Sequence, residues 1–263
     1  FKTPTYGASL YGQASYDSDH WNVTAGVRID HEKSTMDYNS YSLINFRIHP
    51  MMEGYLPLNT VFKGDNSIDA TEIMPKVSLT YKHSKGSIYT SVAKGYKAGG
   101  FNTQIFSDIL QAQMMNDMMN DLGIKLDGVG GTTYDSASAT RYRPETSWNC
   151  ELGTHLTPTP SLKLDASLFW IECFDQQVTV LPHGKNTGRM MSNAARARSY
   201  GVELSARYNY KGLSLSADYG YTNARFREYD DGVADYSGNY LPYAPQNTVS
   251  LTAAYKWQIN NRR

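Results

Sequence analysis

Apolar and polar residues alternate along much of this chain. In residues 213–221 (LSLSADYGY), Leu213, Leu215 and Ala217 share one face with two tyrosines, whereas the serines, Asp218 and the glycine share the other. A period of two predicts an extended strand with two chemically different faces. The apolar face of such a strand meets either a protein core or, in a transmembrane barrel, lipid.

The alternation divides the chain into nine predicted strands. They lie at about 5–16, 21–33, 74–82, 86–94, 145–157, 161–174, 198–210, 213–223 and 246–258. Tight turns rich in Gly, Pro, Asp or Ser are expected at 17–20, 82–86, 157–160 and 211–212, and long connections at 34–73, 95–144, 175–197 and 224–245. Because tight and long connections alternate, an antiparallel up-and-down meander places every long loop at one end, as in outer-membrane barrels.

Strand length and aromatic placement favour a membrane barrel over a soluble sheet. The predicted strands have roughly 9–14 residues, enough to cross a bilayer with tilt, whereas soluble strands have about 5–6. Aromatic residues gather near strand ends, as in the girdles of membrane barrels. They are Tyr6, Tyr16, Trp21, Tyr81, Trp148, Trp170, Tyr208, Tyr210, Tyr219, Tyr221, Tyr255 and Trp257. The alternative is a soluble β-sandwich binding module, in which Leu213, Leu215 and Ala217 would be buried in protein.

Composition is compatible with this interpretation. The 263 residues carry 25 basic and 25 acidic side chains, so no charge excess points to nucleic acid. Mean hydropathy is −0.52, and no stretch of about 18 apolar residues predicts a membrane helix, although a barrel is not excluded. Tyrosine is enriched at 21 residues and suits membrane–water interfaces. Strand character begins near Tyr6 and the chain stops soon after Trp257, so we expect a piece of a longer protein without a signal peptide of its own.

Three local expectations follow from the same pattern. Residues 107–122 predict a helix, capped by Ser107 or Asp108, whose apolar face packs on the rest of its own loop. The alternative is that its methionines form an adaptable surface that contacts a ligand or partner. The cysteines at 150 and 173 fall on opposite faces out of register, which predicts two free thiols. Glycines inside strands mark either a bulge or kink, or space left for an inner domain.

The 211–212 turn also fixes a register for the strands on either side of it. It places Ser205 opposite Asp218 and Arg207 opposite Ser216, so that Arg207 and Asp218 become diagonal neighbours able to form an ion pair.

No catalytic chemistry is indicated. The six histidines show no metal-binding spacing, no nucleophile elbow is present, and the 128–131 glycines lack the strand and helix of a phosphate loop. We therefore expect neither an enzyme, nor a resident metal, nor an intrinsic cofactor.

Two segments resemble a known family. Residues 94–102 (KGYKAGGFN) are similar to a strand-to-loop segment of TonB-dependent outer-membrane receptors, and residues 193–204 (NAARARSYGVEL) are similar to a strand entry of the same family. Weaker echoes occur at 11–16, 21–28 and 242–249.

The resemblance implies an outer-membrane receptor of the siderophore-receptor type. Such receptors have a 22-stranded transmembrane β-barrel closed by a plug, take up a ferric siderophore or similar scarce nutrient, and are energised by the TonB complex acting on the plug. Residues 1–263 would form part of one barrel domain, with about nine strands and without the plug or the terminal strands. The expected partners are the TonB complex, outer-membrane lipid and a small-molecule ligand, with no nucleic acid; the expected location is the bacterial outer membrane.

Ligand capture is expected from cationic and aromatic residues at the long-loop end, because ferric siderophores are often anionic with aromatic parts. The candidates are Lys94, Tyr96, Lys97, Phe101, Asn102, Arg141, Arg143, Arg189, Arg196 and Arg198. Each of them can also be a solvated side chain or pair with a loop carboxylate. A passive porin shares the strand pattern and is a second alternative.

Overall fold

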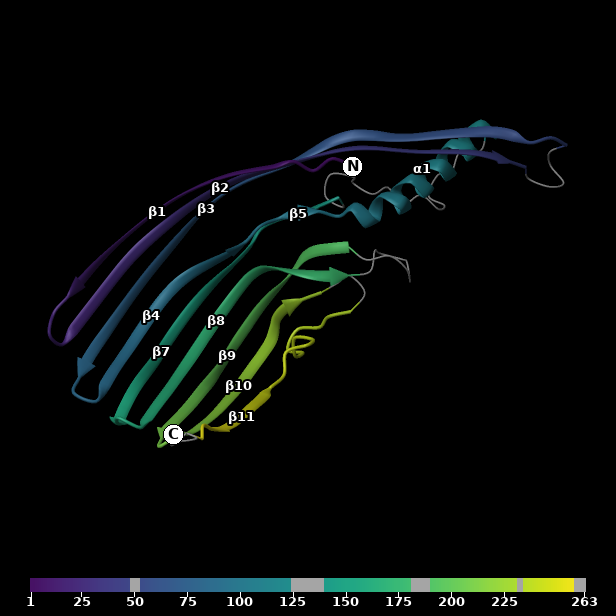
Figure 1. Ribbon diagram of the computed structural model, residues 1–263. Helices are drawn as coiled ribbons and strands as arrows, with labels where there is room; N and C mark the ends of the chain where they lie inside the picture. The colour runs from purple at the N-terminus through teal and green to yellow at the C-terminus, as the bar shows by residue number, and fades with distance from the viewer. Residues whose placement is uncertain (48–52, 124–139, 181–189, 231–233, 258–263) are drawn as a thin grey trace, which may run out of the picture.

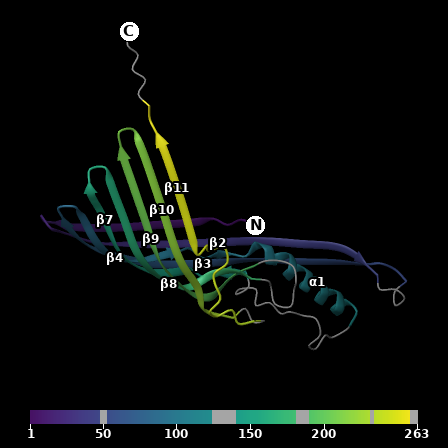
Figure 2. The same ribbon diagram turned by 90° about the horizontal axis from the view of Figure 1, so that it is seen from below.

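The protein folds into one antiparallel sheet that curves into a trough (Figures 1 and 2). In the computed structural model, residues 1–47, 53–123, 140–180, 190–230 and 234–257 are described. The sheet consists of β1 (Thr5–Asp17), β2 (Trp21–Phe46), β3 (Leu56–His83), β4 (Gly86–Lys97), β7 (Glu145–Thr159), β8 (Leu162–Val180), β9 (Met190–Tyr210), β10 (Leu213–Tyr229) and β11 (Asn247–Tyr255). Each strand pairs with its neighbours in chain order, with β1 and β11 at the two edges. The predicted meander is confirmed.

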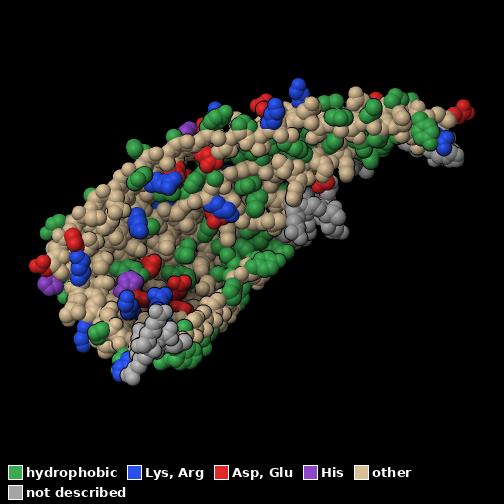
Figure 3. All heavy atoms as spheres, viewed as in Figure 1, with side chains coloured by type: hydrophobic (Ala, Val, Ile, Leu, Met, Phe, Trp, Pro, Cys, Tyr) green, Lys and Arg blue, Asp and Glu red, His purple; other side chains and the backbone are tan. Residues whose placement is uncertain are grey.

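The two faces of the trough differ in chemistry as the alternation predicts. Large apolar side chains on the convex face are exposed, for example Leu168 at 56%, Leu204 at 45% and Leu251 at 76%. Charged side chains gather in the hollow (Figure 3). Leu215 is 41% exposed and Ala217 is also exposed. The described residues therefore do not form the buried apolar layer that a β-sandwich requires on this face.

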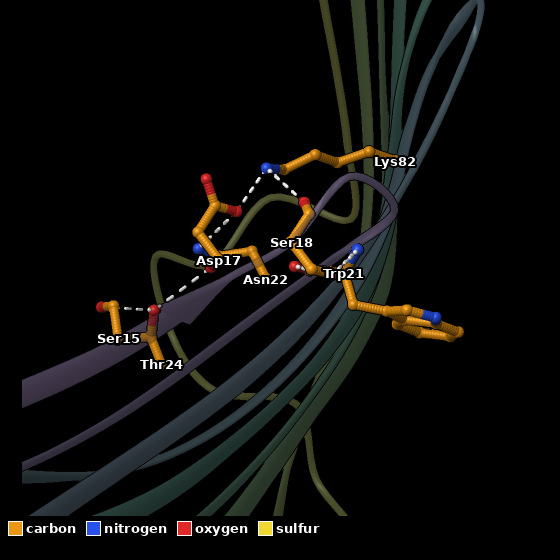
Figure 4. Close-up of polar contacts among 7 residues, drawn as sticks. All are labelled: Ser15, Asp17, Ser18, Trp21, Asn22, Thr24 and Lys82. Carbon is orange, nitrogen blue, oxygen red and sulfur yellow. Dashed lines mark hydrogen bonds and ion pairs between the residues drawn. The ribbon is translucent and has the colours of Figure 1, made fainter.

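Polar side chains tie the first hairpins together at the tight-turn end (Figure 4). The Lys82 ammonium pairs with the Asp17 carboxylate, which also accepts a hydrogen bond from the Asn22 amide at 3.3 Å. Ser18 and Trp21 close the β1–β2 turn through hydrogen bonds of 3.2 Å. The Trp21 ring points away from this polar group and packs against Tyr81, with ring centroids 4.8 Å apart. The convex face therefore ends in aromatic rings at the tight-turn end.

The long connections differ from expectation, because much of them is strand. The β2–β3 hairpin extends the predicted strands as far as Phe46 paired with Leu56, and β8, β9 and β10 also continue beyond their predicted ends. Beyond the trough, apolar residues such as Met36 and Leu58 are buried singly and do not recur at every second position, so the regular alternation fades while the backbone ladder continues. Sequence periodicity therefore underestimated these strands.

A helix packs on the extended hairpin. It is α1 (Phe106–Asp121), preceded by the short 3-10 helix η1 (Thr103–Ile105). Its first turn packs on the hairpin in a cluster of buried residues made of Met36, Ile105, Phe106 and Ile109. Residues of β2 and β3 also lie against the helix, and Thr60 of β3 donates a 2.9 Å hydrogen bond to Asp117. The 124–139 part of its own loop, on which the helix is predicted to pack, lies outside the described residues.

The predicted cap of α1 is wrong. The N-cap is Ile105, which makes no side-chain cap hydrogen bond, and the Ser107 hydroxyl bonds to the Gln104 carbonyl instead. The helices among the described residues are too short or too polar to cross a membrane.

Two interior glycines make room for aromatic rings of the neighbouring strand. A Cβ on Gly153 would lie 2.5 Å from the Tyr89 ring, and a Cβ on Gly201 would lie 2.8 Å from the Phe169 ring and 1.9 Å from the Tyr221 carbonyl oxygen. Tyr89 is the direct cross-strand partner of Gly153, and Phe169 is that of Gly201. At these two positions the space is occupied by a ring of the sheet itself, whereas sequence reasoning considered a bulge or space for an inner domain.

The cysteine and register predictions are confirmed, but the predicted ion pair is not formed. Both cysteines are free thiols, and Cys150 lies opposite Trp170. Ser205 pairs with Asp218, and Arg207 with Ser216. Asp218 accepts a 2.7 Å hydrogen bond from Ser205, whereas the Arg207 guanidinium lies 4.0 Å from Asp165 of β8. Arg207 therefore pairs with Asp165 of the preceding strand and not with Asp218, its diagonal neighbour on β10.

Candidate ligand-binding site

A small second sheet shapes the long-connection end. It pairs β5 (Gly100–Phe101) with β6 (Arg141–Tyr142), so that Phe101 lies opposite Arg141. The pairing is close: a Cβ on Gly99 would lie 2.5 Å from the Tyr142 carbonyl oxygen. The glycines of the KGYKAGGFN segment therefore allow the two ends of the 95–144 connection to meet.

Asn102 fastens this pair to the start of β9. Its amide nitrogen donates to the Met191 carbonyl at 2.8 Å, and its amide oxygen accepts from the Met191 backbone N–H at 2.7 Å. The side chain thus satisfies both backbone groups of Met191 as a neighbouring strand would. Asn102 is only 6% exposed, which excludes water from competing for these bonds.

Asn193 makes the corresponding contact from the other motif. Its amide oxygen accepts from the Arg143 N–H at 2.5 Å, and its amide nitrogen donates to the carbonyls of Arg143 at 2.7 Å and Asp175 at 2.9 Å. Asp175 has a φ of 52°, a conformation that Asp tolerates better than most residues, and it lies within an irregularity of the β8–β9 ladder. The two family-like segments therefore brace the same loop ends.

Charged groups nearby are paired but accessible. The Arg143 guanidinium donates to Asp175 at 2.7 Å, with 71% of the arginine side chain exposed. Lys97 lies 3.9 Å from Glu145, whose carboxylate also accepts from the Gln177 N–H at 2.8 Å. Exposed pairs of this kind contribute about 0–1 kcal/mol, so an anionic ligand can replace the carboxylate at small cost.

A cleft of about 560 Å³ opens beside the braced loop ends. Arg141, Tyr142 and Arg143 line it together with Asp69 of β3 and Asn193 of β9. A second hollow of about 320 Å³ is lined by Phe101, Asn102, Tyr142 and the two methionines that begin β9. Guanidinium groups beside aromatic and thioether side chains suit an anionic ligand with apolar or aromatic parts.

The structure brings together only part of the predicted residue set. Phe101, Asn102, Arg141 and Arg143 line the two hollows, and Lys97 lies beside the same loop ends through Glu145. Arg189 lies outside the described residues.

Lys94 and Tyr96 lie where β3 and β4 separate. The two strands stop pairing at Lys76 and Ala93, and just beyond this point the Lys94 ammonium bonds to Glu72 at 2.8 Å. About one fifth of each of these two side chains is exposed. This ion pair ties β4 to β3 where the ladder has ended.

Arg196 and Arg198 have different surroundings from the rest of the set. Both guanidinium groups contact Glu172, and Arg198 stacks on Trp170. Trp170, Glu172 and Arg198 lie on the side of the sheet that carries Leu168 and Leu204. They therefore face away from the hollow.

Sequence reasoning missed Asn193, Asp175 and Gln177 as site residues. Asn193 begins the segment that carried the family resemblance, which was the available signal. Asp175 and Gln177 carried none, because their contacts depend on a ladder irregularity. Among the described residues, no three His, Cys, Asp or Glu side chains are grouped to hold a metal ion.

The comparisons with known proteins identify the family. The family model described as "TonB dependent receptor-like, beta-barrel" matches residues 1–263, and the chain belongs to this family. The pesticin receptor of Yersinia enterocolitica is 25% identical over 87% of this chain. The chain spans 27% of that receptor's length.

Solved structures share the fold. The ferric yersiniabactin uptake receptor FyuA from Yersinia pestis superposes with a TM-score of 0.59 at 22% identity, over 95% of this chain and 31% of that one. The copper transporter OprC gives a TM-score of 0.65 at 12% identity, over 97% and 34%. Because these two neighbours transport different cargoes, the shared fold does not specify a ligand.

Proposed function

We propose that this chain is part of a receptor that imports a ferric siderophore or a similar anionic metal chelate across the bacterial outer membrane. Membership of the TonB-dependent receptor-like family is the observation that carries the proposal. It accounts for a two-faced meander whose long connections all lie at one end.

The convex face supports a membrane location. On β9 the outward aromatic residues Tyr208 and Tyr200 are about 27 Å apart along the strand, at about 3.4 Å per residue. With a strand tilt of about 40°, this corresponds to a band roughly 20 Å tall, close to the apolar band of outer-membrane barrels. Leucine and valine side chains fill the band between these two rows.

The remainder of the receptor completes the proposal. Residues 1–263 supply about nine strands of a barrel domain, and 22 strands, a plug and a TonB-contacting segment are what the family implies for the whole protein. In this arrangement the polar hollow of the sheet faces the plug. TonB acts on the plug from the periplasm, and the receptor needs no resident cofactor and catalyses no reaction.

The cleft beside Arg141 and Arg143 is the proposed point of ligand contact. Its guanidinium groups are accessible and can form bidentate hydrogen bonds to carboxylate, catecholate or similar oxygens. Phe101 and Tyr142 offer aromatic surface in the neighbouring hollow. Lys97 adds a third cation at the same loop ends.

Growth on defined iron sources tests the proposal. A strain that lacks the full gene is grown on single ferric chelates, with wild type, Arg141→Ala/Arg143→Ala, or Lys85→Ala restored. Lys85 is an exposed cation at the tight-turn end and serves as the control. At least one chelate should require the gene. The double variant should need about tenfold or more chelate for half-maximal growth, because each charged hydrogen bond contributes about 1.5–3 kcal/mol.

Two outcomes would contradict this proposal. If no chelate depends on the gene, iron import is wrong; if the arginine variant matches wild type on the dependent chelate, the ligand site is wrong. Deleting TonB separates active import from a passive porin. Uptake through a receptor stops in that strain, whereas diffusion through a porin continues.

A further inference from the structure

Three arginines stand on the convex face, beyond its upper aromatic row. Arg198 is the cross-strand partner of both Glu172 and Arg225, and no register shift separates these three residues from the lipid-type face of Leu168 and Leu204. Arg196 joins them through Glu172 and through stacking on Phe174, 4.9 Å from the ring centroid. We call Arg196, Arg198 and Arg225 the arginine belt. Its cations face the exterior of the sheet, where a plug or a lumenal ligand cannot reach them.

The belt is held in place by one shielded carboxylate and by aromatic rings. Glu172 is 12% exposed and accepts from Arg198 Nε at 2.7 Å, and it lies 3.2 Å from Arg196 Nη2. Arg198 lies 4.6 Å from the Trp170 ring centroid, and Arg225 lies 3.7 Å from that of Tyr240. Such stacking fixes the planar guanidinium groups and lowers the entropy lost on binding an anion.

Among the residues that the structure describes, the charges of the belt are incompletely balanced. Its three guanidinium groups meet the shielded Glu172 and the 77% exposed Glu228, which lies 3.8 Å from Arg196. Arg225 bonds to the Gly238 carbonyl, which carries no charge. Arg196 and Arg198 retain 41% and 27% exposure, so an external anion can approach both.

The height of the belt on the sheet identifies the anion. Trp170 and Tyr200 are cross-strand partners with stacked rings 5.3 Å apart, and they form the aromatic row that sits at a membrane–water interface. Glu172 and Arg198 follow two residues further toward the long-connection end. Lipid headgroups lie at that level, and arginine binds phosphate bidentately.

We propose that the arginine belt binds the phosphate groups of a phosphorylated glycolipid in the outer leaflet of the membrane. The inference assumes the membrane location proposed above but not the iron cargo. The acyl chains of the lipid would lie along the apolar band below Trp170. The lipid would anchor β8–β10 at the level from which the long connections emerge.

Binding of lipid A to the full-length receptor in nonionic detergent tests this. Native mass spectrometry counts bound copies of diphosphoryl lipid A and of its dephosphorylated form. Wild-type receptor should bind the diphosphoryl form at least tenfold more tightly. Replacing Arg196, Arg198 and Glu172 together by glutamine removes the charges without leaving an unpaired carboxylate, and this variant should lose the preference.

The control changes a similar ion pair on the opposite face. Arg207→Gln with Asp165→Asn alters an arginine–aspartate pair that faces the hollow on the same two strands, and it should keep the phosphate preference. Equal binding of the two lipid A forms to wild type would overturn the proposal, as would an unchanged preference in the belt variant. Arg141→Ala/Arg143→Ala should bind lipid A normally, so failure of the iron proposal and failure of this one are distinguishable.

Discussion

Asparagine side chains replace missing backbone partners at the long-connection end. Asn102 and Asn193 each offer one donor and one acceptor to a single residue of another segment, Met191 and Arg143 respectively. A side-chain amide places a donor NH₂ and an acceptor oxygen next to each other, and asparagine is the shorter of the two residues that carry one. This explains why an asparagine stands in each of the two segments that resemble the family.

The Asn102 brace is expected to hold the start of β9. Asn102→Ala leaves the Met191 N–H and carbonyl without these partners, which costs about 1–3 kcal/mol per unsatisfied buried group. Exchange of the backbone amide hydrogens should accelerate at 98–102 and 190–193. It should change little in the strand pairs near the tight turns. Asn39→Ala, at an exposed position on β2, is the control and should leave both segments unchanged. Equal exchange in both variants would show that the contact does not order the loop.

A second residue-scale prediction concerns acid. The Ser237 hydroxyl and backbone N–H donate to Asp235 and lower the pKa of its carboxyl in the loop after β10. Because the folded pKa lies below the unfolded value of about 3.9, this contact contributes stability above that pH and loses it as pH falls through the folded value. Carbon NMR titration should give Asp235 a pKa below 3.9, and Ser237→Ala should raise it. A pKa at or above 3.9 in wild type would contradict the assignment.

Strands in this sheet are specified by facing pairs rather than by single residues. Gly153 and Gly201 are poor strand formers alone, but each lies under an aromatic ring of the adjacent strand. The glycine and the ring together cover the concave side of the ladder. Element stability at these positions therefore depends on a residue from another strand.

Gly201→Ala should destabilise the β9–β10 ladder. The new Cβ would lie 1.9 Å from the Tyr221 carbonyl oxygen, a backbone atom that must move, and overpacking of this kind costs about 1–3 kcal/mol. Gly12→Ala in β1 is the matched control, since nothing lies within 4 Å of its Cβ. Folding of the full receptor is followed by the heat-dependent gel shift in detergent. The Gly201 variant should lose the folded band at a lower temperature, and equal temperatures for the two variants would refute the steric argument.

The whole molecule is a curved sheet with unequal environments on its two sides. Its convex side exposes more large apolar side chains than a soluble domain retains, while its concave side carries paired charges such as Arg207 with Asp165, 4.0 Å apart. With the membrane location proposed above, the curvature gives one side to lipid and encloses the other. Adjacent residues of one strand therefore respond oppositely to the same change.

Leu168→Lys and Ser167→Lys test this asymmetry within β8. Leu168 lies on the convex face two residues below the Trp170 row, where the cost of a lysine lies between about 2–4 kcal/mol at the bilayer midplane and about 0–1 kcal/mol near the interfaces. Ser167 lines the hollow, where a lysine stays hydrated. The Leu168 variant should reach the outer membrane in lower amount, measured by quantitative immunoblot of membrane fractions, while the Ser167 variant should resemble wild type. The reverse order would exchange the two faces.

The sequence by itself determined the nine strands of the main sheet, their order, their two faces and the register at the 211–212 turn, such as Ser205 with Asp218. Period-two alternation and turn chemistry are local, and a meander pairs strands that are neighbours in the chain. Tertiary structure decided what local pattern does not encode. It continued the β2–β3 ladder to Phe46, and it paired Arg207 with Asp165 rather than with Asp218.

Tertiary structure also divided the predicted cations between two surfaces. Arg141 and Arg143 line the cleft at the loop ends, whereas Arg196 and Arg198 face outward beside Trp170. All four are arginines near strand ends, so composition and position alone could not separate them. The physical reason is that strand parity, ladder irregularities and the brace from Asn193 set the direction of each side chain, and these depend on the strand next to it.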